Sequence, residues 1–218
     1  MTVWFITGTS RGLGREFAIT ALERGDLVAA TARNLGDLDD LAEKYGPAVL
    51  PLRLDVTDRA AAFAAVERAH DHFGRFDVVG NNAGCGQYGF VEELSETELR
   101  AQMDINFFGA VWITQAALPY LRAQRGGHLI QVSSIGGATA SPNLARSHAS
   151  NRAPQGPSHP PAQEVAPFGI KVTIVEPGGF STDWVGSAQQ ADRLPAYAAE
   201  HAKFERARTR RMTRMGLP

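Results

Sequence analysis

The sequence predicts an α/β protein built on a doubly wound parallel sheet with helices on both faces. Strand-like and helix-like segments alternate along the chain, which is the pattern of parallel strands joined by helical crossovers. Residues 1–15, MTVWFITGTSRGLGR, run a short apolar strand through a glycine-rich turn into a helix. With 218 residues, 44% of them hydrophobic, the chain can bury one sizeable core. These observations indicate a Rossmann-like arrangement.

The first half of the chain supplies four of the expected strands. A strand over 3–7 precedes a helix over about 12–24, and a strand over 27–31 precedes a helix over about 36–45. The strand over 48–54 ends in Leu-Asp-Val-Thr-Asp, where Asp58 is placed to cap an alanine-rich helix over 59–73. A fourth strand follows over 76–80.

The second half begins with a capping box formed by Ser95 and Glu98. It opens a helical stretch that is expected to run to about Gln124, with a break near Asn106–Gly109. Strands over 128–133 and 170–175 complete the regular pattern. No internal repeat or linker divides it.

The turn over residues 7–14 has the composition of a phosphate-binding loop. Gly8, Gly12 and Gly14 leave room for backbone N–H groups to face an anion, and glycine accepts the positive φ that such turns often need. The following helix would direct its unpaired amides and the positive end of its dipole at the same place. A GxxxGxG string is a weak signal alone, but a strand before it and a helix after it strengthen it.

Composition and charge narrow the class of protein. A single cysteine, Cys85, excludes an internal disulfide and suits a reducing compartment. No apolar run approaches the roughly 20 residues of a membrane span, and a strand beginning almost at Met1 leaves no space for a signal peptide. We therefore expect a cytoplasmic protein with no membrane partner and no metal site.

The segment Lys203–Arg214 is strongly basic, with six basic residues and one acidic residue. Such a run could bind nucleic acid or another acidic surface. Since no aromatic residues or recognisable motif accompany it, a solvated or out-of-frame tail is favoured and no nucleic-acid partner is expected.

Further motifs fall at the expected carboxyl ends of strands, where open α/β sheets bind ligands. They are Thr7-Gly8-Thr9-Ser10-Arg11-Gly12-Leu13-Gly14, Asn81-Asn82-Ala83-Gly84, Asn106, Val132-Ser133-Ser134, and Pro177-Gly178-Gly179 with Thr182. In this order and spacing, residues 3–185 resemble the short-chain dehydrogenase/reductase family. The flanking text NNAGCGQYGFVEELS and IVEPGGFSTDW is similar to the branch with 17β-hydroxysteroid and retinol dehydrogenase-like enzymes. The resemblance implies an apolar ketone, aldehyde or alcohol as substrate, and homo-oligomers.

The resemblance also implies which residues bind the cofactor. Asp55 would lie beside the adenine amino group, although an Asp that merely starts a turn is the alternative. Arg11 and Arg33, with no acid at positions 32–34, suit the 2′-phosphate of NADP better than the ribose of NAD. Asn81 is expected to be structural. The implied cofactor-binding set is Gly8, Ser10, Arg11, Gly12, Leu13, Gly14, Arg33, Asp55, Val56, Asn82, Ala83, Gly84, Pro177, Gly178 and Thr182.

The catalytic positions depart from the family. Asn106 and Ser134 match it, but Ser147 and Asn151 stand where the family has the Tyr and Lys of its YxxxK pair. A serine hydroxyl is a far weaker acid than a phenol, and a neutral amide supplies no positive field. Two functions remain open. One is an NADPH-dependent oxidoreductase with impaired activity, and the other is a catalytically inactive NADP-binding protein that acts as a sensor or as an inactive oligomer partner.

Two further departures concern structure. Pro154, Pro157, Pro160 and Pro161 interrupt the helix expected over 152–167, so residues 145–162 should form an irregular loop. Beyond Trp184 the sequence no longer resembles the family, whose seventh strand we expect to be missing, which would leave the edge of the sixth strand unpaired. Residues 1–185 are thus expected to form the dinucleotide-binding domain and residues 186–218 an altered C-terminal tail.

Overall fold

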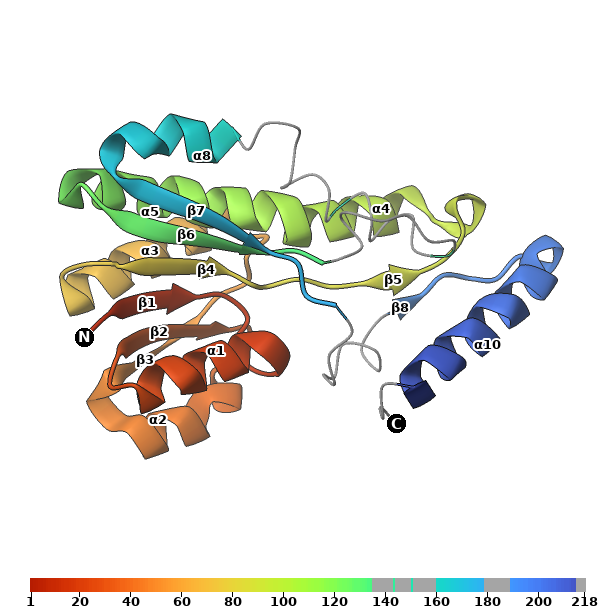
Figure 1. Ribbon diagram of the computed structural model, residues 1–218, viewed down its shortest axis with the longest axis horizontal. Coiled ribbons are helices and arrows are strands. Elements are labelled where there is room, and N and C mark those ends of the chain that lie inside the picture. Colours follow the sequence, from red (N-terminus) through yellow and green to blue (C-terminus); the bar gives the residue numbers. More distant parts are fainter. Residues whose placement is uncertain (135–142, 144–149, 151–159, 179–188, 215–218) are drawn as a thin grey trace.

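The protein, seen in a computed structural model, is organised around one twisted parallel sheet (Figure 1). The structure describes residues 1–134, 143, 150, 160–178 and 189–214. The strand order is β3-β2-β1-β4-β6-β7, and every pairing is parallel. The strands are β1 (Val3–Ile6), β2 (Leu27–Ala32), β3 (Val49–Arg53), β4 (Val78–Asn81), β6 (Gly127–Val132) and β7 (Ile170–Val175). The predicted doubly wound sheet is confirmed, with its topological switch point between β1 and β4.

Helices α1 (Gly12–Glu23) and α2 (Asp39–Tyr45) cover one face of the sheet over β1, β2 and β3. A 3₁₀ turn over Leu35–Leu38 leads into α2, so the predicted helix over 36–45 is only partly α-helical. The buried side chains of this layer include Ile6, Leu22 and Leu41. Because each strand presents alternate residues to this face, the short apolar runs of β1 and β2 serve two cores at once.

Helices α3 (Arg59–Phe73) and α5 (Gly109–Gln124) cover the other face, where Phe5, Phe76 and Leu129 are fully buried. Asp58 caps α3 as predicted, since its carboxylate accepts a hydrogen bond from the Ala61 backbone N–H at 3.0 Å. This packing confirms helices on both faces.

The helical stretch from α4 (Glu96–Met103) to α5 contains no break, which corrects the expectation of one near Asn106–Gly109. A π-helical turn over Asp104–Phe108 joins the two helices instead. The capping box of Ser95 and Glu98 at the start of α4 is confirmed. Gly109 does not interrupt the helix. Glycine is needed there for close packing, because a Cβ would lie 2.7 Å from Cγ2 of Val56.

The structure describes only part of the proline-rich segment that was predicted to be an irregular loop. Helix α8 (Pro160–Val165) begins at the third of the four prolines, so the prediction of an irregular segment through residue 162 is wrong at its end. Proline is tolerated in the first helical turn, where the missing N–H has no intrahelical partner. Pro154 and Pro157 lie outside the described residues. At the sheet edge, β7 pairs only with β6 among the described strands, as expected.

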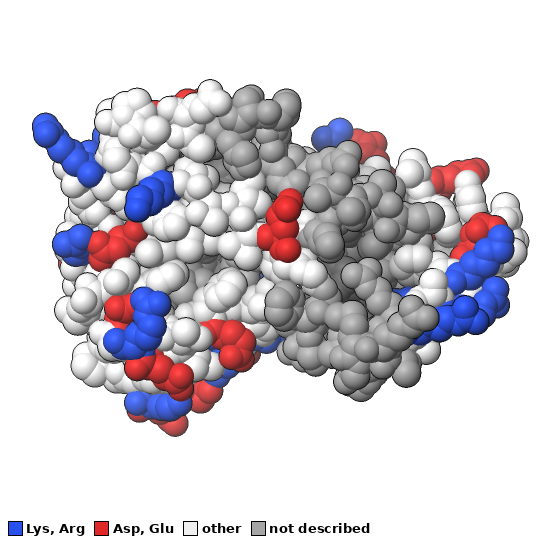
Figure 2. Space-filling view, in the orientation of Figure 1, with Lys and Arg blue, Asp and Glu red and all other residues white. Residues whose placement is uncertain are grey.

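Residues 189–210 form ordered elements, while the basic side chains Lys203, Arg206 and Arg210 stay exposed to solvent. Strand β8 (Gln189–Gln190) pairs in parallel with β5 (Gln87–Tyr88), and a 3₁₀ turn over Pro195–Tyr197 leads into helix α10 (Ala198–Arg214). Side chains at helical spacing, Tyr197, His201 and Phe204, pack on residues 88–93. Basic side chains gather over this helix in the space-filling view (Figure 2). No helix of the described chain is long and apolar enough to span a membrane.

Candidate cofactor and active site

The glycine-rich loop lies between β1 and the start of α1. Gly8 and Gly12 have φ angles of +70° and +61°, which L side chains rarely adopt. No side chain caps α1, and its first turn holds no acidic residue. The first amides of α1 are therefore available to an anion in the cradle that the glycines leave open, which fits the pyrophosphate of a dinucleotide.

Hydrogen bonds from residues that follow β4 hold the glycine-rich loop in place. The Asn82 side-chain amide donates hydrogen bonds to the backbone oxygens of Thr7, at 2.9 Å, and Gly8, at 3.1 Å. The Thr7 hydroxyl in turn accepts from the backbone N–H groups of Asn82 and Ala83, each at 2.9 Å. Sequence reasoning assigned Asn82 to the cofactor and missed this bracing contact.

Two of the glycines are required by these close approaches. A Cβ on Gly14 would lie 2.2 Å from Nδ2 of Asn82 and 2.4 Å from the Gly8 oxygen. A Cβ on Gly8 would lie 3.0 Å from Cα of Ala83. The paired occurrence of a GxxxGxG string and an Asn-Ala-Gly string in one sequence is the signal that could have indicated this contact. Asn81, next to Asn82, points instead to α5 and donates to Oγ1 of Thr114 at 3.0 Å.

Three arginines lie near the loop and differ in availability. The Arg15 guanidinium forms an ion pair with Asp40 and donates to the backbone oxygen of Asp37 at 3.1 Å. The Arg15 hydrogen bond holds the pKa of the Asp40 carboxyl below its ordinary value. Arg11 and Arg33 are exposed, and neither makes a hydrogen bond or ion pair with the part of the chain that the structure describes. Arg33 directly follows β2, so both can contact an anionic group between the loop and that strand end.

The segment after β3 places Asp55 in a turn. Its Oδ1 accepts hydrogen bonds from the backbone N–H and the hydroxyl of Thr57, at 3.0 and 2.8 Å. These bonds are those of an Asp that starts a turn, which was the alternative to a role in cofactor binding. The carboxylate is exposed, so it can also accept a hydrogen bond from a ligand. Val56 is buried against Gly109.

Asn106 lies in the π-helical turn and is held on three sides. Its Oδ1 accepts from the Cys85 N–H at 2.9 Å, and its Nδ2 donates to the Cys85 oxygen and to Oγ of Ser150, both at 3.0 Å. The Gln102 side chain donates to the same Ser150 oxygen at 2.8 Å. Asn106 and Gln102 thus both bind Ser150, which immediately precedes position 151, the position of the family's Lys. Short π-helical turns are frequent at functional sites.

Ser134 is half-buried and lies two residues beyond β6. The Ser133 N–H donates to the Val175 oxygen at 2.8 Å, which aligns the ends of β6 and β7 and brings Ser134 near the segment with Pro177 and Gly178. Ser147, Asn151 and Thr182 lie outside the described residues.

The described candidate residues share one edge of the sheet. Apart from Asn106, they follow β1, β2, β3, β4, β6 and β7, and the carboxyl ends of parallel strands all meet at that edge (Figure 1). At the glycine loop, Ser10 and Leu13 are half-buried beside the cradle, and Ala83 and Gly84 follow β4. No group of His, Cys, Asp and Glu side chains suited to a metal ion occurs within the described ranges.

Comparison with known proteins places this arrangement in a family. A family model described as short chain dehydrogenase matches residues 2–193. The chain belongs to the short-chain dehydrogenase family of oxidoreductases.

Two relatives show how far the likeness extends. The chain is 48% identical over 189 residues to "Oxidoreductase BOA17" from Botryotinia fuckeliana, covering 86% of this chain and 69% of that protein. A short-chain dehydrogenase structure from Streptomyces avermitilis superposes with a TM-score of 0.87 at 40% identity, covering 91% of this chain and 75% of the other. The chain spans about two thirds of the length of curated relatives, with 69% and 65% for two of them.

Solved structures in the comparison hold nicotinamide cofactors. ElxO with NADP bound is 27% identical, with a TM-score of 0.80 and coverage of 84% of this chain and 75% of that chain. A 3-ketoacyl-(acyl-carrier-protein) reductase from Brucella melitensis complexed with NADH is 26% identical, with a TM-score of 0.82 and coverage of 86% and 79%.

Proposed function

We propose that the chain binds NADP at the glycine loop and descends from enzymes that transfer a hydride between NADPH and an apolar ketone, aldehyde or alcohol. The observation that carries the proposal is the uncapped, glycine-lined start of α1, with exposed Arg11 and Arg33 beside it. Relatives that hold NADP and NADH support a nicotinamide cofactor. The arginines favour the 2′-phosphate of NADP, because guanidinium groups form charge-assisted pairs with phosphate.

Different residues of the chain would bind different parts of the cofactor. The amides at the start of α1 would hold the pyrophosphate, while Arg11 and Arg33 would hold the 2′-phosphate. Asp55 and Val56 would border the adenine, and Ala83, Gly84, Pro177 and Gly178, with Thr182, would border the nicotinamide side. The bound cofactor supplies or accepts the hydride. The Ser134 hydroxyl would donate a hydrogen bond to the substrate oxygen, and Asn106 would support the site through Cys85 and Ser150.

Proton transfer to the substrate oxygen is the step that this chain lacks. Ser147 and Asn151 occupy the positions of the family's Tyr and Lys. Loss of positioned acid–base catalysis typically removes about 10²–10⁴ in rate. This substitution favours a second function, a catalytically inactive NADP-binding protein that acts as a sensor or as an inactive partner in an oligomer. For either function we expect a cytoplasmic location, because one cysteine suits a reducing compartment.

Fluorescence titration with NADPH and NADH tests the cofactor assignment. NADPH should bind more tightly, and Arg33→Asp should narrow or reverse the preference because it places a carboxylate beside the 2′ position. Arg68→Asp, an exposed change on α3, is the matched control and should leave the preference unchanged. Equal affinities for the two cofactors in the unmodified chain would contradict the NADP assignment.

A further inference from the structure

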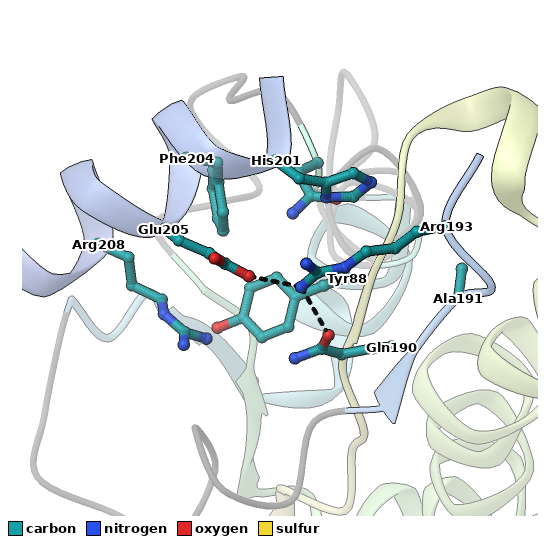
Figure 3. Close-up of a pocket in the computed structure, with 9 residues that line it drawn as sticks. Tyr88, Gln190, Ala191, Arg193, His201, Phe204, Glu205 and Arg208 are labelled. Atoms are coloured by element: carbon teal, nitrogen blue, oxygen red, sulfur yellow. Dashed lines mark hydrogen bonds and ion pairs between the residues drawn. The ribbon is translucent and has the colours of Figure 1, made fainter. Parts of the chain in front are cut away.

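Helix α10 has an inner face that is anchored to the body of the protein. The Phe204 ring lies 5.7 Å from that of Tyr88, and the Arg208 guanidinium lies over the Tyr88 ring at 5.5 Å. Both side chains line a small pocket between α10 and the strands β5 and β8, and they point from the helix toward Tyr88 (Figure 3). The apolar side of the helix is therefore already occupied.

The anchor also includes a buried contact between a histidine and a carboxylate. Nε2 of His201 lies 2.7 Å from Oε1 of Glu93, and both side chains are almost fully buried. The same Glu93 oxygen accepts from the Leu194 N–H at 3.0 Å, and Arg193 pairs with Glu205 at 2.5 Å. These contacts fix which side of α10 faces outward.

The outward face of α10 carries a row of cations. Lys203, Arg206 and Arg210 are exposed and follow one another at spacings of three and four residues, which places them along one side of a helix. Lys203 pairs with Glu200 at 2.6 Å, whereas Arg206 and Arg210 form no ion pair with a described residue. From Lys203 to Arg210 the row extends about 10 Å along the helix axis.

This row stands apart from the charge of the rest of the molecule. Residues 198–214 hold six basic and two acidic residues, a net charge of +4 in a chain whose net charge is −1. The rest of the chain therefore has a net charge of −5. In Figure 2, blue side chains lie over α10, and at the opposite end of the molecule blue and red side chains are mixed. On charge alone, a polyanion would be attracted to this helix more strongly than to the rest of the molecule, which is acidic overall.

We propose that the outward face of α10 binds the phosphate backbone of nucleic acid, independently of base sequence. Arginine matches phosphate with paired hydrogen bonds, and a duplex offers phosphates at regular intervals along each strand. A helix that binds a membrane surface needs an apolar face to insert between lipids, and the large apolar side chain described on α10, Phe204, packs inward.

Fluorescence anisotropy of the full chain with a labelled 20-base-pair duplex tests the proposal. The dissociation constant should lie within about 10⁻⁴–10⁻⁶ M at physiological salt. The logarithm of the binding constant should fall with the logarithm of the salt concentration with a slope of about −2 to −3, as two or three phosphate contacts require. The charge-reversed variant Arg206→Glu/Arg210→Glu should lose about tenfold or more in affinity. The control Arg53→Glu/Arg68→Glu makes the same change in net charge at exposed sites on β3 and α3.

The outcomes separate the alternatives. Binding that is lost in the α10 variant and retained in the control, with unchanged affinity for duplexes of different sequence, supports the proposal. No binding, or equal loss in both variants, overturns it. Binding to vesicles of phosphatidylserine and phosphatidylcholine without binding to the duplex also overturns it, because the partner would then be a membrane. Circular dichroism of both variants verifies that the helix content is unchanged.

Discussion

Asn82 contributes more to the candidate site than its place in the chain suggests. It stands 75 residues from Thr7, yet its side chain satisfies two loop oxygens that would otherwise face the interior of the site. Hydrogen bonds of this kind between side chain and backbone fix the loop in one shape before a ligand arrives. The contact requires glycine at position 14, because no larger residue leaves room for the Asn82 amide.

This requirement gives a prediction for Gly14→Ala. The added methyl group must displace either Asn82 or the Gly8 peptide, so we expect a loss of about 1–3 kcal/mol in the free energy of unfolding, as for other overpacked sites. NADPH affinity should fall with it, because the displaced loop no longer presents its amides. Urea denaturation and fluorescence titration measure the two effects.

Gly36→Ala is the matched control. Gly36 is exposed, and a Cβ there would meet its nearest neighbour at an ordinary 3.6 Å. Its free energy of unfolding should change by less than about 0.5 kcal/mol. An equal loss in the free energy of unfolding in the two variants would contradict this explanation. It would show that the close approach between Gly14 and Asn82 is not the reason why position 14 needs glycine.

At the scale of elements, one buried carboxylate, that of Glu93, contributes to holding α10 in place. Burial alone would raise the pKa of Glu93, but hydrogen bonds from His201 and from the backbone N–H groups of Phe90 and Leu194 outweigh it, and the pKa lies below its ordinary value of 4.5. A carboxyl group with a lowered folded pKa stabilises the fold above its unfolded pKa. That stabilisation is lost as the pH falls through the folded pKa.

The corresponding prediction concerns Glu93→Gln. At pH 7 this variant should lose about 1–3 kcal/mol in the free energy of unfolding, because it removes a charged hydrogen-bond acceptor from a buried site. The difference from the unmodified chain should narrow as the pH falls below about 4.5 and on through the lowered pKa of Glu93, because the carboxylate is then protonated. Urea denaturation at a series of pH values measures it.

Glu96→Gln is the control for this series, since Glu96 is exposed and pairs only with Arg100 at 2.7 Å among the described residues. Its effect should be small at every pH, as for other surface ion pairs. A Glu93→Gln difference that stays constant as the pH falls from 7 through the lowered pKa of Glu93 would contradict the account of how α10 is held.

At the scale of the whole molecule, the sheet could be predicted and the C-terminal unit could not. The apolar runs of the strands are continuous because both faces of a parallel sheet are covered, and β7 occupies the predicted residues 170–175. Strands β5 and β8 have two residues each, too short for any periodic pattern. Helix α10 is rich in charge, and its docking depends on Tyr88 and Glu93, which are distant in sequence. The π-helical turn differs from an α-helix by a local hydrogen-bond shift that composition does not reveal.

The central claim is that this chain retains the cofactor cradle of its family but lacks the groups for proton transfer. The most direct measurement is NADPH oxidation with a panel of apolar ketones and aldehydes, with NADPH binding verified in the same sample. Two proteins are compared, the unmodified chain and a variant carrying Ser147→Tyr and Asn151→Lys, with Pro154 and Pro157 replaced by alanine. We predict that both bind NADPH and that the unmodified chain is slower by at least about 10²-fold. A comparable rate in the unmodified chain, abolished by Ser134→Ala, would contradict the claim, because another group would then replace the tyrosine.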